Sequence, residues 1–168
     1  MMEKGYGNAE FLDIFSSIIS GFNQPLKQEH LQIFEHCLIP MHRKKFVGYF
    51  RQNLINAVLS FVKRDKSLAE QAIMACLRYW PLIDPNKEIA SLSEIETILN
   101  QLKSTEHLQV VKGFLTKRIA ICVCSNHYGV AEKALFLLHN PVMLSLLGEK
   151  GDENCEEVHL ELVADALM

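Results

Sequence analysis

Glycine and proline are scarce in this sequence, and several other signals are missing. Eight glycines and five prolines in 168 residues are too few for a disordered or fibrous chain. No stretch approaches the ~18 uncharged apolar residues of a membrane-spanning helix. The N-terminus also lacks the apolar core of a secretory signal peptide. Since the five cysteines are odd in number and no export signal is present, we predict reduced thiols and a cytosolic or nuclear location.

Motifs of catalysis and metal binding are also absent. The sequence has no nucleophile elbow, glycine-rich phosphate loop or His-Glu-x-x-His spacing. Cys122 and Cys124 are two residues apart on an expected helix, so they point to different faces, and no second pair stands at zinc-finger spacing. We therefore predict no catalytic residues, no metal and no cofactor. A small helical enzyme that uses cysteine and histidine is the competing hypothesis, and a turnover assay tests it.

The charge of the chain is small and unevenly distributed. The net charge is −3, and residues 149–168, with seven acids and one lysine, carry −6, which leaves +3 for the rest. A dedicated nucleic-acid binder would be strongly basic, so we predict no nucleic-acid partner. Three interpretations of the acidic segment stay open: a helix with its charges in water, an ordered end-cap, and a flexible tail.

Nearly every segment carries apolar residues at helical spacing. Phe11, Phe15, Ile18 and Phe22, for example, fall on one face of a helix. Two short apolar runs that resemble strands have no partner with hairpin chemistry, so we interpret them as a loop and part of a helix. The expected helices begin near residues 8, 28, 51, 68, 87, 106 and 128.

Alternate helix starts recur every ~40 residues, which is the period of HEAT and armadillo repeats. We therefore predict an all-α fold, an α-solenoid of HEAT/armadillo-like helix pairs with about seven to eight helices that share one core. The expected domain spans residues 8–148, between a disordered or artificial extension at 1–7 and the acidic segment at 149–168. The helix at 8–22 then lacks a partner, so we expect a central fragment that begins in mid-repeat, whose exposed half-core favours self-association.

Several residues mark the expected helix ends. Ser67 followed by Glu70 predicts a capping box, and Pro40 predicts the end of the helix that begins near residue 28. Pro81 separates two helices, and Trp80 stands directly before it. The tryptophan ring either covers the turn or is available to a partner, and the pattern alone does not distinguish these roles.

The order and spacing of three blocks are more specific than a generic HEAT pattern. The blocks are "IISGFNQPLKQEH", "AEQAIMACLRYWPLIDPNKEIASLSEIETIL" and "CVCSNHYGVAEKALFLLHNPVMLSLL", and their most distinctive words are "PLKQEH", "RYWP" and "VAEKAL". Together they resemble the B-prime regulatory subunits of protein phosphatase 2A, from residue 10 to residue 147 without obvious gaps. Beyond Gly148 the sequence departs from the family pattern.

The resemblance implies a HEAT-repeat subunit without catalytic activity. Members of this family join a scaffold subunit and a catalytic subunit of a serine/threonine phosphatase, whose metals belong to the catalytic chain. They select substrate proteins by binding a Leu-x-x-Ile-x-Glu peptide in a groove between repeats. The alternative is a HEAT-repeat adaptor that serves another partner, and a pull-down of the scaffold and catalytic subunits distinguishes the two.

The resemblance places part of the peptide groove at Asp13, Ile14, Ile18, Lys27 and His30. The two isoleucines are four residues apart and can wall an apolar pocket, while Lys27 and His30 can bind peptide carboxylates. The competing interpretations are core packing for the isoleucines and a solvated helix start for the other two. In the family the rest of the groove lies on the preceding helix, so we expect weak or no motif binding by this chain alone.

A ridge of turns is the second candidate surface. The basic loop "PMHRKKFVGYFR" and the turn at 79–87 are expected on the same edge of the solenoid. The resemblance implies that such loops contact the other holoenzyme subunits, and a solvated turn is the competing interpretation. The candidate contact residues are His42, Arg43, Lys44, Lys45, Tyr79, Trp80 and Lys87.

Overall fold

The computed structural model describes residues 7–43 and 47–148, which are mostly helical and contain no strand. The all-α prediction is therefore confirmed. The α-helices are α1 (Asn8–Ser20), α2 (Gln28–Ile33), α3 (Ile39–Met41), α4 (Arg51–Arg64), α5 (Leu68–Arg78), α6 (Pro85–Leu99), α7 (Lys112–Val123), α8 (Tyr128–Leu138) and α9 (Pro141–Gly148). A π-helical turn, η1 (Phe34–Leu38), joins α2 to α3, and η2 (Val47–Tyr49) and η3 (Glu106–Leu108) are 3-10 turns. If residues 28–41 are counted as one rod, the described part has eight helices, as predicted.

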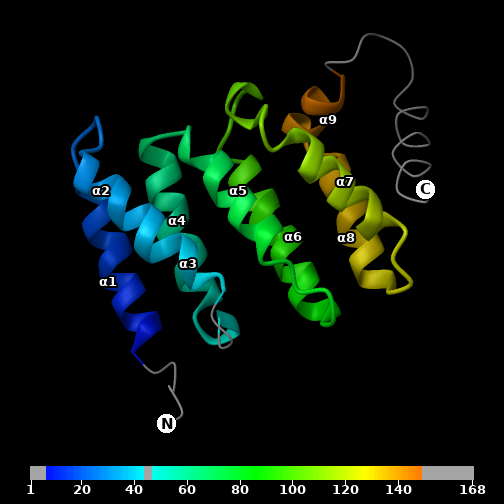
Figure 1. Cartoon of the computed structure of the whole chain (residues 1–168), viewed down its shortest axis with the longest axis horizontal. Helices are drawn as coiled ribbons and strands as arrows, with labels where there is room; N and C mark the ends of the chain where they lie inside the picture. The colour runs from blue at the N-terminus through cyan, green and yellow to red at the C-terminus, as the bar shows by residue number, and fades with distance from the viewer. Residues whose placement is uncertain (1–6, 44–46, 149–168) are drawn as a thin grey trace.

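The helices stack side by side in two layers (Figure 1). One layer holds α1, α4, α6 and α8, and the other holds the rod at 28–41, α5 and α7. Neighbours within a layer touch, and α5 with α6 and α7 with α8 form antiparallel pairs across the layers. This is the alternation of first and second helices that the repeat spacing predicts, and it makes the fold a solenoid.

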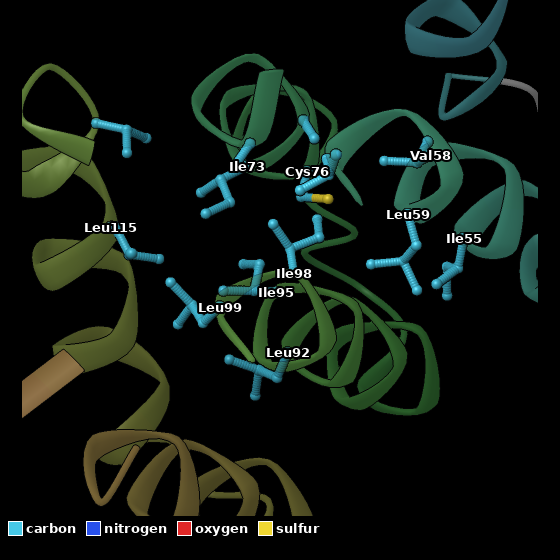
Figure 2. Close-up of a cluster of buried hydrophobic side chains, with 14 of the residues drawn as sticks. Ile55, Val58, Leu59, Ile73, Cys76, Leu92, Ile95, Ile98, Leu99 and Leu115 are labelled. Carbon is cyan, nitrogen blue, oxygen red and sulfur yellow. The ribbon is translucent and has the colours of Figure 1, made fainter. Parts of the chain in front are cut away.

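One apolar core runs between the two layers. Figure 2 shows Leu59 of α4, Ile73 of α5, Ile95 of α6 and Leu115 of α7 directed toward a shared interior, and all four are buried. Burying one such side chain contributes about 1.5–3 kcal/mol. Isolated helices of 11 to 15 residues, the lengths of α5, α6 and α7, are only marginally stable in water. The packing against the shared core therefore stabilises them.

The expected helix at residue 106 begins later, and the reason is a contact between repeats. Residues 106–108 form only the 3-10 turn η3, and α7 starts at Lys112. The Val110 amide donates to Oε1 of Glu70 at 2.9 Å. The predicted Ser67–Glu70 capping box is also wrong, because Ser67 makes no capping bond to α5 and its hydroxyl donates to Asp65 at 2.7 Å.

At two prolines the helix boundary lies a few residues away from the one predicted. Pro40 does not stop its helix directly, since α3 runs on to Met41. The π-turn before it, in which the Ile39 amide bonds the Phe34 carbonyl, widens the helix where the proline follows. Pro85 is the first residue of α6, two positions before the expected start near 87.

α1 carries apolar residues on two adjacent faces. It packs against α4 through Leu12 and Ile19, which are fully buried. Phe11 and Ile18, which were predicted to share one face, are 61% and 52% exposed. Only the face that holds Leu12 and Ile19 therefore meets α4.

Within the described residues, no single helix is long and apolar enough to cross a membrane. α8 and α9 together reach the required length and composition, but they are bent by 72° to one another and contribute buried residues to the core. The predicted acidic segment at 149–168, residues 1–6 of the predicted extension, and Lys44 and Lys45 lie outside the described residues.

Candidate peptide-binding and docking surfaces

The exposed face of α1 is an apolar stripe. Ile14 and Ile18 are 64% and 52% exposed, and Phe11, one turn earlier, stacks on Phe15 with ring centroids 5.8 Å apart. Core packing was the competing interpretation for the two isoleucines, and within this chain both are exposed. The stripe is therefore free to contact another molecule.

Polar contacts fix α1 against α4 beside this stripe. Oδ1 of Asp13 accepts a hydrogen bond from Nδ2 of Asn53 at 2.7 Å, and the hydroxyls of Ser16 and Ser60 lie 3.0 Å apart. Asp13 is exposed but already has this partner. This hydrogen bond helps to hold α1 against α4.

Lys27 and His30 lie where the chain turns from α1 into α2. The His30 ring stacks on Phe22, just beyond the end of α1, with centroids 3.9 Å apart. Nδ1 of His30 accepts from the Lys27 amide at 3.3 Å, so in the neutral ring the hydrogen is on Nε2, which can donate outward. Lys27 is exposed. The turn thus places two donors next to the end of the apolar stripe, beyond Ile18 along the chain.

The two turns of the predicted ridge, before α4 and before α6, lie on one edge of the stack (Figure 1). Nη1 of Arg51, at the start of α4, donates to the Lys87 carbonyl in the first turn of α6 at 3.2 Å, which links the starts of the two helices. Three apolar residues of these two turns are largely exposed, namely Ile83 at 96%, Tyr49 at 82% and Leu82 at 72%. Sequence reasoning missed these three, although two apolar residues between Pro81 and Pro85 were a signal.

The seven predicted contact residues are placed unequally. Arg43 and Lys87 are exposed, Tyr79 is half-buried, and Lys87 pairs with Asp84 at 3.2 Å. His42 and Trp80 are only 7% and 9% exposed. The Trp80 ring lies in the core under the guanidinium of Arg118, 5.4 Å from the ring centroid, so it covers the turn from inside. Burial argues against direct partner contact by His42 and Trp80.

His42 belongs to a buried ionic cluster that sequence reasoning did not find. Its Nε2 lies 2.8 Å from Oε1 of Glu94, and its Nδ1 lies 3.0 Å from the Ile39 carbonyl oxygen. Nε of Arg51 is 3.6 Å from Oε2 of Glu94, and Nη2 of Arg51 donates to Ser91. Because the Ile39 carbonyl oxygen and the Glu94 carboxylate both accept, both ring nitrogens of His42 donate, which makes the ring a cation.

The pKa directions in this cluster agree with that assignment. Burial lowers the pKa of His42, but the hydrogen bond and the charge of Glu94 outweigh burial, so the pKa is raised above 6.5. Burial, and then the Glu94 charge, raise the pKa of the Cys76 thiol well above its usual range. Ligand atoms of His42, Cys76 and Glu94 lie within 4.8 Å of one another, a spacing that suits a metal. The two cations beside Glu94 already compensate its charge, so we assign the cluster a structural role.

Comparison with known proteins gives the family. The family model of the protein phosphatase 2A regulatory B subunits (B56 family) matches residues 1–162. The family pattern therefore runs past residue 148, where a departure from it was expected.

The kappa isoform of the 57 kDa B' regulatory subunit from Oryza sativa subsp. japonica is 43% identical over 143 residues, which are 85% of this chain and 28% of the relative. The beta isoform of the 56 kDa regulatory subunit from Oryctolagus cuniculus is 39% identical over 152 residues, 90% of this chain and 29% of the relative. The alpha isoform from Homo sapiens is 41% identical over 147 residues, 88% of this chain and 30% of the relative. The chain thus spans less than a third of the length of these relatives, and it belongs to the B56 family of protein phosphatase 2A regulatory B subunits.

Proposed function

We propose that this chain is a non-catalytic regulatory part of a protein phosphatase 2A holoenzyme, in the cytoplasm and the nucleus. In this role it binds the scaffold and catalytic subunits and selects substrate proteins through short Leu-x-x-Ile-x-Glu-like motifs. The family of the chain supports the regulatory role, since the similar proteins are named as regulatory subunits of this phosphatase. The serine/threonine phosphatase chemistry then belongs to another subunit.

The observation that carries the motif-binding part is the exposed apolar stripe of α1 beside two donors. Ile14 and Ile18 give about one helical turn of apolar wall for a leucine or isoleucine side chain of a peptide. Lys27 and Nε2 of His30 supply hydrogens that a glutamate carboxylate of the same peptide accepts. An apolar wall next to cationic and polar donors fits an acidic, apolar linear motif.

The edge of turns is the surface we propose for the other holoenzyme subunits. Leu82 and Ile83 in the turn before α6 are 72% and 96% exposed, and the exposed cations Arg43 and Lys87 belong to the turns of the same edge. Apolar anchors with a charged rim are the usual composition of a protein–protein contact. These positions support docking through the turns rather than through the helix faces.

Co-purification tests this function. The chain is mixed with purified scaffold and catalytic subunits, and complex formation is followed by size-exclusion chromatography. We expect a complex that is lost in the double variant Leu82→Glu with Ile83→Glu. Val110→Glu is the matched control, because Val110 is 69% exposed but lies on the connection between α6 and α7, at the opposite edge of the stack. No complex with either partner, or equal loss in the control, would contradict the proposal.

A further inference from the structure

Three side chains of the kinds that bind metals meet inside the core. His42 follows α3, Cys76 lies on α5 and Glu94 lies on α6, and they are 7%, 4% and 1% exposed. Figure 2 shows Cys76 on the core side of α5. One ligand atom of each residue lies within 4.8 Å of those of the other two. An imidazole, a thiol and a carboxylate at this spacing form a donor set that suits zinc.

The histidine is held as a metal ligand would have to be. Nδ1 of His42 lies 3.0 Å from the Ile39 carbonyl oxygen, which orients the ring and turns Nε2 toward Glu94. Histidine ligands of metals usually donate their other ring nitrogen in this way. Arg51 has partners of its own on α6, because its two terminal nitrogens donate to the Lys87 carbonyl and to the Ser91 hydroxyl. These contacts hold the cluster in one arrangement.

The Glu94 carboxylate keeps unused acceptor capacity. Its Oε1 contacts His42, but within the described residues its buried Oε2 has no hydrogen-bond partner. Nε of Arg51, 3.6 Å from Oε2, is also buried without a hydrogen bond. Buried polar atoms are nearly always hydrogen-bonded, and a bound ion is one explanation for an exception. One oxygen of Glu94 is therefore available to a cation.

We propose that His42, Cys76 and Glu94 bind one Zn²⁺, which links α3, α5 and α6 inside the core. Zinc takes nitrogen, sulfur and oxygen ligands, whereas Mg²⁺ and Ca²⁺ prefer oxygen alone. Around a tetrahedral zinc ion such ligand atoms lie roughly 3.3–3.6 Å apart, so the 2.8 Å contact between His42 and Glu94 opens slightly. Three protein ligands leave the fourth position to a water molecule.

The charge of the core permits this exchange. In the protonated cluster, His42 and Arg51 are cations, Glu94 is an anion and burial keeps Cys76 a neutral thiol. Zinc binds a neutral imidazole and a thiolate, so one proton leaves His42 and one leaves Cys76. The ion brings two positive charges in place of these two protons, and the net charge of the core stays the same. The structural role assigned above belongs to the protonated cluster, and zinc gives the cluster a second state.

Cobalt titration of the full chain tests this site. Co²⁺ accepts the same ligands as Zn²⁺, and a bond to a thiolate gives it a charge-transfer absorption band. The parent for the titration has serine at positions 37, 124 and 155, so that Cys76 and Cys122, both buried, are the remaining thiols. We expect one Co²⁺ per chain, two protons released per Co²⁺ bound, and loss of the band when Zn²⁺ is added.

Single substitutions in this parent assign the ligands. Cys76→Ser should remove the band, and Cys122→Ser, the matched control with a buried thiol on α7, should retain it. His42→Gln keeps the thiol and should weaken Co²⁺ binding at least about tenfold. Circular dichroism checks that each variant is folded.

Thermal melts give a second measurement. Free Zn²⁺ at about one hundred times the dissociation constant should raise the melting temperature of the parent by roughly 5–10 °C and leave that of Cys76→Ser unchanged. No cobalt band in the parent, an equal band in Cys76→Ser, or an equal zinc-dependent shift in both proteins would overturn the proposal.

Discussion

Glu94 is the side chain whose loss we expect to destabilise the fold most through electrostatics. It is 1% exposed on α6 and faces two cations, with His42 at 2.8 Å and Arg51 at 3.6 Å. The variant Glu94→Gln keeps the size of the side chain and removes its charge. The positive charges of His42 and Arg51 then lie in or beside the core without a counterion.

The magnitude follows from the cost of an uncompensated buried charge. Removing one partner of a buried ion pair lowers the free energy of unfolding by about 3–5 kcal/mol. At about 2–4 °C per kcal/mol for a domain of this size, the melting temperature should fall by roughly 10 °C. Glu96→Gln is the matched control, since Glu96 pairs with Lys133 near the surface, with side-chain exposures of 31% and 25%. Its loss should cost only about 0–1 kcal/mol.

The same cluster makes stability depend on pH. The pKa of His42 is raised in the folded state above its ordinary value of 6.5. Protonation of His42 therefore stabilises the fold fully at pH below 6.5, and this contribution is lost as the pH rises through the folded-state pKa. Thermal melts followed by circular dichroism should show wild type losing stability on this rise, and Glu94→Gln should lose less. Equal melting temperatures for Glu94→Gln and Glu96→Gln would refute the assignment of a compensated buried charge.

The remaining predictions concern the core tryptophan, the α1–α2 turn and the thiols. Trp80→Ala should lower the free energy of unfolding by about 3–5 kcal/mol in urea titrations, because a ring that is 9% exposed leaves a cavity. A loss below about 1 kcal/mol would mean that the ring is not part of the core. Replacing Lys27 and His30 together by glutamate should abolish the weak binding of a Leu-x-x-Ile-x-Glu peptide, followed by NMR shift changes, because acceptors replace the donors. Shift changes equal to those of wild type would place the peptide elsewhere. Burial raises the pKa of Cys122 to about 11, so an alkylating reagent at about pH 8 should modify exposed Cys124 first. Equal rates by mass spectrometry would contradict the burial of Cys122.

Periodicity in the sequence predicts the helices because each one buries a repeating apolar face. The period does not show which of two apolar faces will meet a neighbour. On α1, residues 11 and 18 compete with residues 12 and 19, and only the position of α4 decides between them. Similarly, the late start of α7 depends on Glu70, which is 40 residues away in the chain from the Val110 amide that it binds. Local pattern carries no information about such a contact.

The candidate sites, too, were predictable from the sequence only in part. Resemblance to a family selects Ile14, Ile18, Lys27 and His30, but their exposure and the stacking of His30 on Phe22 come from the fold. The ionic cluster joins His42 to Glu94 across 52 residues. Its one local signal was an acid among the apolar positions of α6, where a carboxylate requires a buried partner.

The most direct test of the proposed recognition surface is an NMR titration of the isotope-labelled chain with a Leu-x-x-Ile-x-Glu peptide. We expect weak binding, with the largest shift changes at Ile14, Ile18, Lys27 and His30 and none at Val110. A scrambled peptide of the same composition should produce no such pattern. Shift changes confined to other helices, or micromolar binding that leaves these four residues unperturbed, would contradict a peptide-binding surface at α1 and α2.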